Sequence, residues 1–163
     1  MTSTIDAFLD PCGSVWATPG RRINYVDVGS GESGVVLLVA GLGMQRIEWQ
    51  PEFPAALVAR GYRVIAADNR DCGRSFVAGA EYGLADMARD LIELMVHLQV
   101  PRFHVVGISM GGMLAQHVAL AAPDACASLT SLMSTTGRRG VGRPHDISKW
   151  IFRTDAPTDT RDA

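Results

Sequence analysis

Several features that would assign this chain to a common class are missing. The 163 residues contain only three cysteines, which are odd in number and scattered: Cys12, Cys72 and Cys126. Such cysteine usage does not make a disulfide framework and is typical of a reducing compartment, so we expect a cytoplasmic protein. Residues 1–10 have neither a basic segment nor an apolar core. No secretory signal is therefore recognised at this end.

Excess charge and metal or nucleotide motifs are also missing. The chain has 15 basic and 17 acidic residues, a net charge of -2. A nucleic-acid partner is therefore not expected, because nothing neutralises a run of phosphates. No apolar run reaches the ~18 residues of a membrane span. Gly29–Gly34 matches the dinucleotide fingerprint, but it leads into a strand instead of opening a helix. We expect no metal, no cofactor and no membrane partner.

What is present is an alternation of apolar strands and amphipathic helices. Hydrophobic residues make up 47% of the chain, and Val35–Ala40 is a continuous apolar run, as in strands buried on both faces. Residues 14–28 alternate around Pro19-Gly20, which predicts a hairpin with a type II turn. Further strands are predicted at 62–67, 103–107 and 129–133, and helices at 51–60, 84–99 and 110–122. This order predicts an α/β fold, with a mostly parallel sheet, helices on both faces and an N-terminal antiparallel hairpin.

The predicted helix 84–99 has the clearest amphipathic pattern. Its apolar residues, Leu84, Met87, Leu91, Leu94, Met95 and Leu98, recur at helical spacing. The charged residues and a histidine fall on the other side of the helix: Asp86, Arg89, Asp90, Glu93 and His97.

The strongest chemical motif is Gly107-Ile108-Ser109-Met110-Gly111, between a predicted buried strand and a predicted helix. A sharp turn there lifts the Ser109 hydroxyl above the strand ends, and the glycines let strand and helix approach closely. The start of the helix favours developing negative charge. The alternative is a plain glycine-rich turn, which the flanking strand and helix disfavour.

Two further loops follow buried strands. Residues 40–44 (Ala-Gly-Leu-Gly-Met) can donate a backbone N–H to an oxyanion together with the N–H of Met110, although they also fit an ordinary connecting loop. In residues 68–75 (Asp-Asn-Arg-Asp-Cys-Gly-Arg-Ser), Asp68 and Arg70 can lock the loop through a charge-assisted hydrogen bond. We interpret that pair as structural and not catalytic.

Together, these three segments resemble the α/β-hydrolase superfamily, and within it the aclacinomycin methylesterase and haloperoxidase-like branch. The resemblance covers residues 14–136 and implies a partial α/β-hydrolase fold with Ser109 as nucleophile. It also implies that the backbone N–H groups of Leu42 and Met110 form the oxyanion hole, and that no cofactor is needed. One departure is Ala40, where the family often has a histidine. That change removes an orienting side chain but not the backbone donor.

The family's acid and histidine base, which follow the serine along the chain, are not recognised here. Only His117 and His145 follow Ser109, and Asp124 is the only acid between Ser109 and His145. His117 lies on the same predicted helix as Ser109, roughly 12 Å further along it, and Asp124 is expected in a surface turn. Two explanations stay open. The chain is the N-terminal part of a longer hydrolase, or it is complete and uses another base, such as His145 of its own tail or of a neighbouring subunit.

The sequence therefore predicts a serine hydrolase that acts on small-molecule carboxylic esters. The alternative is a truncated or non-catalytic hydrolase-like scaffold that serves interaction or regulation. Residues 1–136 are expected to form the hydrolase core, and residues 137–163 a tail or the start of a cap, with a short helix near 147–152. The strand at 129–133 would leave an apolar edge open, so we expect a homodimer or higher homo-oligomer.

Overall fold

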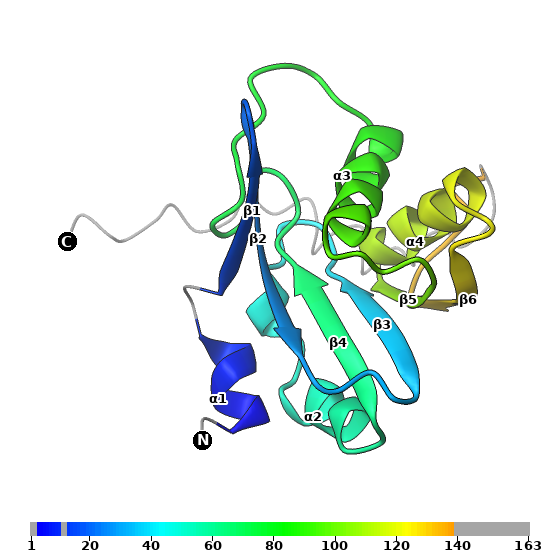
Figure 1. The fold of residues 1–163 in the computed structure, drawn as a ribbon. Helices are drawn as coiled ribbons and strands as arrows, with labels where there is room; N and C mark the ends of the chain where they lie inside the picture. The colour runs from blue at the N-terminus through cyan, green and yellow to red at the C-terminus, as the bar shows by residue number, and fades with distance from the viewer. Residues whose placement is uncertain (1–2, 11–12, 139–163) are drawn as a thin grey trace, which may run out of the picture.

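The computed structural model describes residues 3–10 and 13–138 of the chain. Within these residues, six strands form one mixed sheet in the order β1-β2-β4-β3-β5-β6 (Figure 1). The strands are β1 (Ser14–Thr18), β2 (Arg21–Val28), β3 (Gly34–Val39), β4 (Tyr62–Ala67), β5 (Phe103–Ile108) and β6 (Cys126–Leu132). The helices are α1 (Thr4–Leu9), the 3-10 turn Arg46–Glu48, α2 (Glu52–Val58), α3 (Leu84–His97) and α4 (Met110–Ala121). The predicted fold class, an α/β fold with a mostly parallel sheet and an N-terminal antiparallel hairpin, is confirmed.

The hairpin and the parallel strands lie where the sequence predicts them. β1 and β2 pair antiparallel with Thr18 opposite Arg21, and Gly20 has the positive φ of 79° that a type II turn needs. β2 pairs antiparallel with β4, while the pairs β4–β3, β3–β5 and β5–β6 are parallel. The order of the central strands follows from crossovers through α2, α3 and α4.

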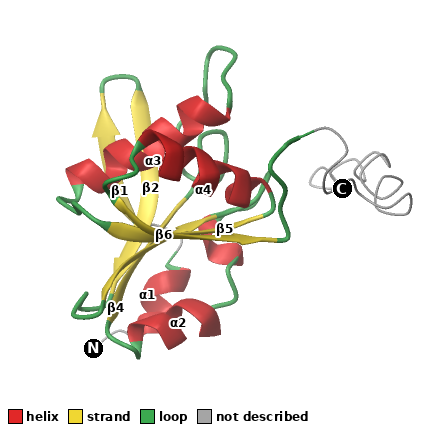
Figure 2. Cartoon of the chain, turned by 90° about the vertical axis from the view of Figure 1, so that its right-hand side faces the viewer, coloured by secondary structure: helices red, strands yellow, loops and turns green. Residues whose placement is uncertain are grey.

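The sheet is covered on both faces, as the continuous apolar run in β3 indicates. Val36 and Leu38 face a core shared with α1 and α2, while Leu37 and Val39 face a core shared with α3 and α4. Figure 2 shows these two pairs of helices on opposite sides of the sheet. Side chains of β3 are buried on alternate faces, which explains why the strand reads as one apolar run.

One charged residue of α3, on the side opposite the predicted apolar residues, is buried. Asp90 is only 3% exposed, because its carboxylate accepts from Arg70 on the loop after β4 and from Arg21 on β2. A charge on the polar side of a helical pattern is normally solvated. Here the arginines brought by two other elements satisfy it inside the structure.

The N-terminal helix α1 is an element that the sequence did not predict. Its Phe8 is fully buried, and the buried guanidinium of Arg46 donates to the carbonyl oxygens of Phe8 (2.8 Å) and Asp10. The same guanidinium donates to the Asn24 side chain at 3.0 Å. Six residues make a poor isolated helix, so tertiary contacts stabilise α1.

At the other end of the sheet, β6 is an edge strand with little cover. Residues 128–133 are all exposed, including Leu129 at 42% and Met133 at 82%. The tail from 139 onward, with the short helix expected near 147–152, lies outside the described residues. In residues 3–10 and 13–138, no helix is long and apolar enough to span a membrane.

Candidate active site

Ser109 occupies the turn between β5 and α4 in an unusual backbone conformation. Its φ of 56° and ψ of -122° lie outside the regions that residues with a side chain normally adopt, and the residue is exposed. Its N–H donates to the Leu132 carbonyl oxygen at 2.9 Å, and its carbonyl oxygen accepts from the Gly112 N–H at 3.0 Å. Such strain persists where the surroundings hold it, and it is concentrated at functional sites.

Two glycines make this sharp turn possible. A Cβ atom on Gly107 would lie 2.0 Å from the Gly111 carbonyl oxygen, and a Cβ on Gly111 would lie 2.2 Å from the Val39 carbonyl oxygen. Both distances are far below van der Waals contact. The glycines at 107 and 111 are therefore required by the close approach of β5, α4 and β3, as the motif indicates.

The loop after β3 lies directly against the turn that carries Ser109. A Cβ on Gly41 would be 3.4 Å from the Ser109 Cβ and 3.3 Å from the Ile108 carbonyl oxygen. The Met44 N–H donates to the Gly41 carbonyl oxygen at 3.3 Å, which closes a tight turn around residues 42 and 43. The Leu42 side chain at its tip is 78% exposed. The structure thus brings the two predicted segments together.

A buried carboxylate ties these loops to one another. Asp68 is 3% exposed, and its side chain accepts from the Arg46 N–H at 2.8 Å and from the Arg74 N–H at 3.2 Å. The side chain of Asn69 donates to the Ala40 carbonyl oxygen at 3.2 Å. The structural interpretation of Asp68 is supported, but its partner is not Arg70 as expected. Backbone N–H groups hold Asp68, and Arg70 pairs with Asp90.

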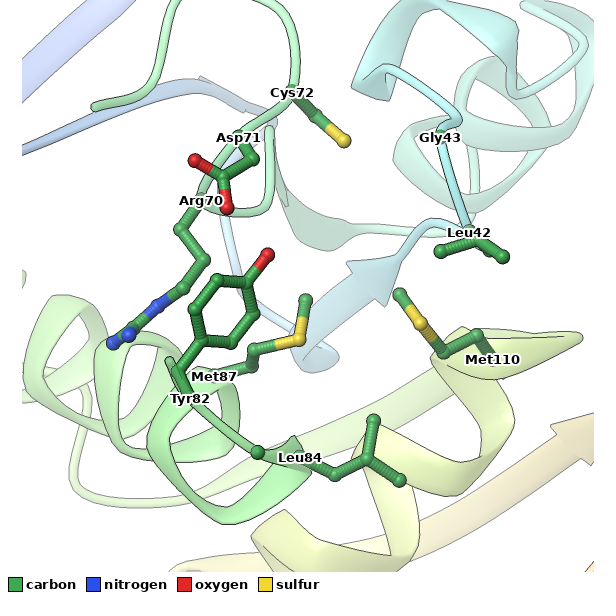
Figure 3. Close-up of a pocket in the computed structure, with 10 residues that line it drawn as sticks. Leu42, Gly43, Arg70, Asp71, Cys72, Tyr82, Leu84, Met87 and Met110 are labelled. Atoms are coloured by element: carbon green, nitrogen blue, oxygen red, sulfur yellow. The ribbon is translucent and has the colours of Figure 1, made fainter. Parts of the chain in front are cut away.

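A pocket of about 360 Å³ opens beside this turn. Both predicted oxyanion residues, Leu42 and Met110, line it, together with Gly43, Arg70, Asp71, Cys72, Tyr82, Gly83, Leu84 and Met87 (Figure 3). Ser109 is not part of the lining, but it precedes Met110 directly. Figure 3 shows the side chains of Met87 and Met110 pointing into the same space.

Sequence reasoning missed most of the pocket wall. Leu84 and Met87 are expected core residues of α3, and they line the pocket because the first turn of the helix ends the core there. Tyr82 lies in a loop with no periodicity, so no sequence signal could have found it. The loop 69–75 was singled out only as a structural lock.

The polar groups of the pocket are held by specific partners. The Arg70 guanidinium donates twice to Asp90, at 2.7 and 2.9 Å, and lies over the rings of Phe76 and Tyr82. Hydrogen bonds from the Tyr82 hydroxyl and the Ala78 N–H lower the pKa of the Asp71 carboxyl. The Asp71 side chain is therefore ionised at neutral pH.

Cys72 adds a neutral sulfur to the same wall. Burial raises the pKa of the Cys72 thiol, and the nearby Asp68 carboxylate raises it further. At neutral pH the side chain is therefore a thiol and not a thiolate. The thiolate is the form of cysteine that acts as a nucleophile, so Cys72 is a poor nucleophile at neutral pH.

The histidines in the described part of the chain have other neighbours. His97 stacks on Trp16 with ring centroids 5.8 Å apart, and His104 shares a 2.7 Å hydrogen bond with the Ser128 hydroxyl. His117 lines a surface groove between α3 and α4. None of these three lines the pocket beside Ser109, and His145 lies outside the described residues. Among residues 3–10 and 13–138, no three His, Cys, Asp or Glu side chains come together as a metal ion requires.

The order of strands and helices agrees with a comparison against known protein families. The sequence pattern of the alpha/beta hydrolase fold matches residues 34–155. The chain belongs to the alpha/beta hydrolase fold family.

Relatives of this alpha/beta hydrolase chain are longer than the chain itself. "Putative carbamate hydrolase RutD" of Variovorax paradoxus is 43% identical over 108 residues, which are 66% of this chain and 40% of the relative. Rhodomycin D methylesterase DnrP of Streptomyces peucetius is 39% identical over 101 residues, 60% of this chain and 34% of the relative. A hydrolase structure from Pseudomonas aeruginosa matches with a TM-score of 0.70 at 30% identity, and covers 86% of this chain and 50% of that one. The chain thus spans half or less of the length of these proteins.

Proposed function

We propose that this alpha/beta hydrolase chain carries the nucleophile and the oxyanion hole of a serine hydrolase that acts on carboxylic esters. The observation that carries the proposal is the backbone of Ser109, held at positive φ on top of β5 between two obligatory glycines. A turn of this kind exposes the hydroxyl at the N-terminus of α4, where developing negative charge is stabilised.

In this mechanism the Ser109 Oγ attacks the ester carbonyl carbon and forms a new C–O bond. The carbonyl oxygen becomes an oxyanion that accepts from the backbone N–H groups of Leu42 and Met110. The ester bond then breaks, the alcohol leaves with a proton, and water hydrolyses the acyl-serine. Support for the oxyanion loop comes from Asp68, which anchors the Arg46 end of that loop at 2.8 Å.

A general base has to accept the Ser109 proton for fast turnover, because a serine hydroxyl is otherwise a poor nucleophile. We assign no described residue to this role. Within the chain, the candidate for this base is His145. The alternative is a base in a segment that corresponds to the part of the longer relatives outside the match. Without a base, the oxyanion hole and binding alone still leave about 10³–10⁴-fold catalysis over water.

The name of a methylesterase among the relatives favours esters as the substrate class. The direct test is covalent labelling with a fluorophosphonate, followed by peptide mass spectrometry. We expect label on Ser109, lost in Ser109→Ala and retained in Ser131→Ala, a control serine that is also exposed. Label on another serine, or none after long exposure, would reject the nucleophile and favour the scaffold alternative.

A further inference from the structure

We propose that the pocket between Leu42, Tyr82 and Met87 receives an uncharged apolar group of the ester and disfavours an anionic one. The inference rests on the proposed function of Ser109, and it adds the chemical class of the substrate. An aliphatic or aromatic acyl group of moderate size is the occupant that fits.

The position of the pocket connects it to the reacting carbonyl. Its lining includes Leu42 and Met110, the two residues whose N–H groups would hold the oxyanion. A carbonyl oxygen placed at these donors leaves one substituent of the carbonyl carbon next to the pocket opening. The group that enters the pocket is therefore a part of the substrate that is bonded to, or close to, the reacting carbon.

The shape and surface of the pocket suit an apolar group. A volume of about 360 Å³ lies in the range of small-molecule sites and, at ~30 Å³ for each water-sized group, holds about twelve non-hydrogen atoms. Carbon and sulfur atoms of Leu84, Met87 and Met110 form one side of it (Figure 3). Methionine side chains adapt to ligands of different shape, which favours a class of apolar groups over a single compound.

Among the described residues that line the pocket, the one cation is Arg70, and it is already paired with a carboxylate. Arg70 donates two hydrogen bonds to the buried Asp90 carboxylate and a third, at 3.2 Å, to the Asp86 carbonyl oxygen. Its guanidinium carbon also lies over the rings of Phe76 and Tyr82, 5.2 and 4.8 Å from their centroids. An incoming carboxylate would have to break these contacts to pair with Arg70, so the arginine does not recruit anions.

The remaining charge on the wall repels anions. Asp71 is ionised and lies on the pocket rim, where the Tyr82 hydroxyl donates to it. With Arg70 paired to Asp90, Asp71 is the charged side chain among the described lining residues that has no cation hydrogen-bonded to it in the pocket wall. A second carboxylate in the pocket would lose its hydration and gain no counter-charge, which is the costly case for a buried ion.

The wall is also rigid, because the loop that carries Asp71 is closed by its own hydrogen bonds. The Asp71 N–H donates to the Phe76 carbonyl oxygen at 2.9 Å, and the Ala78 N–H donates to the Asp71 carboxylate at 2.7 Å. Asp71 itself has a positive φ of 61°. These hydrogen bonds hold Asp71 in the lining of the pocket, next to the Tyr82 hydroxyl.

The test uses three fluorophosphonates that differ only in the alkyl group on phosphorus: methyl, n-hexyl and 5-carboxypentyl. Rate constants for labelling of Ser109 are measured on the full chain at pH 7.5. We expect the hexyl probe to react at least tenfold faster than the nearly isosteric carboxypentyl probe, and faster than the methyl probe. Equal rates for the three probes, or a faster carboxypentyl probe, would overturn the inference while leaving Ser109 as the nucleophile.

Two variants locate the effect in the pocket. Leu84→Trp fills the space and should lower the ratio of hexyl to methyl rates at least fivefold, whereas Leu120→Trp, at an exposed position on α4, should leave that ratio unchanged. Asp71→Asn should raise the ratio of carboxypentyl to hexyl rates about threefold, the size expected for one solvent-screened charge. An equal change in the ratio of hexyl to methyl rates for Leu84→Trp and Leu120→Trp would overturn the assignment of the apolar group to this pocket.

A binding measurement separates this inference from the proposed chemistry. N-methylhexanamide is titrated into Ser109→Ala protein with ¹³C-labelled methionine methyl groups. We expect shifts of the Met87 and Met110 resonances, and none of Met133, which is 82% exposed directly after β6 and does not line the pocket. Failure of all probes to label Ser109 would reject the nucleophile alone. Absence of the Met87 and Met110 shifts would reject the pocket even if Ser109 is labelled.

Discussion

A Cβ atom on Gly107 would lie 2.0 Å from the carbonyl oxygen of Gly111. The C-terminal end of β5 and the first turn of α4 are therefore in backbone contact. This contact sets the direction of the chain at Ser109, directly after β5. The contact is a packing constraint that is independent of any chemistry at Ser109.

Gly107→Ala should destabilise the fold by about 1–3 kcal/mol, because the added methyl group forces strand and helix apart. Gly79→Ala is the matched control, since a Cβ there meets nothing within 4 Å and its φ is not positive. Urea unfolding of the two variants measures the difference. Equal stability of both would show that the turn relaxes freely.

Asp90→Asn should cost about 3 kcal/mol of unfolding free energy, because it removes one partner of a buried ion pair and leaves Arg70 with its charge unmatched. Glu93→Gln is the control. Glu93 also pairs with Arg21, at 2.7 Å, but it is a third exposed, and such pairs contribute about 0–1 kcal/mol. If both variants lose the same stability, Asp90 is not the anchor of the loop after β4.

Histidine replacement tests the source of the base in cleavage of short p-nitrophenyl esters. His117→Ala should leave the rate unchanged, because His117 lies in a groove of α3 and α4 away from the pocket. His145→Ala should lower it roughly 10²–10⁴-fold if His145 is the general base. An unchanged rate in His145→Ala would remove that residue and favour a base from sequence that this chain does not contain.

The open edge of β6 leads us to expect a homodimer. Its apolar residues are exposed, and no strand of the described residues pairs with its outer edge, which favours strand pairing with a second copy. Light scattering at micromolar concentration should report a dimer, and Leu129→Lys should shift it to a monomer. Val15→Lys, on the opposite edge strand β1 and similarly exposed at 44%, should not. A monomeric wild-type chain would contradict the prediction.

Local patterns were enough for the framework of the fold. The apolar run after Gly34, the amphipathic pattern after Leu84 and the glycines around Ser109 each reflect neighbours within a few residues. For this reason the strands, the main helices and the turn of Ser109 could be predicted close to their observed bounds. The same order of strands and helices places three loops at the carboxyl ends of neighbouring strands, where they meet.

By itself, the sequence determined the order of strands and helices, the strained turn at Ser109 and the class of chemistry that it suggests. Only the tertiary structure decided that Asp90 is buried, that Arg46 holds α1, and that the Tyr82 hydroxyl donates to Asp71 in the wall of a pocket. The reason is the distance along the chain between the partners. Asp90 is satisfied by Arg70 and Arg21, which are 20 and 69 residues away, and Arg46 reaches Phe8 across 38 residues. Periodicity reports on neighbours along a strand or helix, whereas these charges find their partners only after the sheet has assembled.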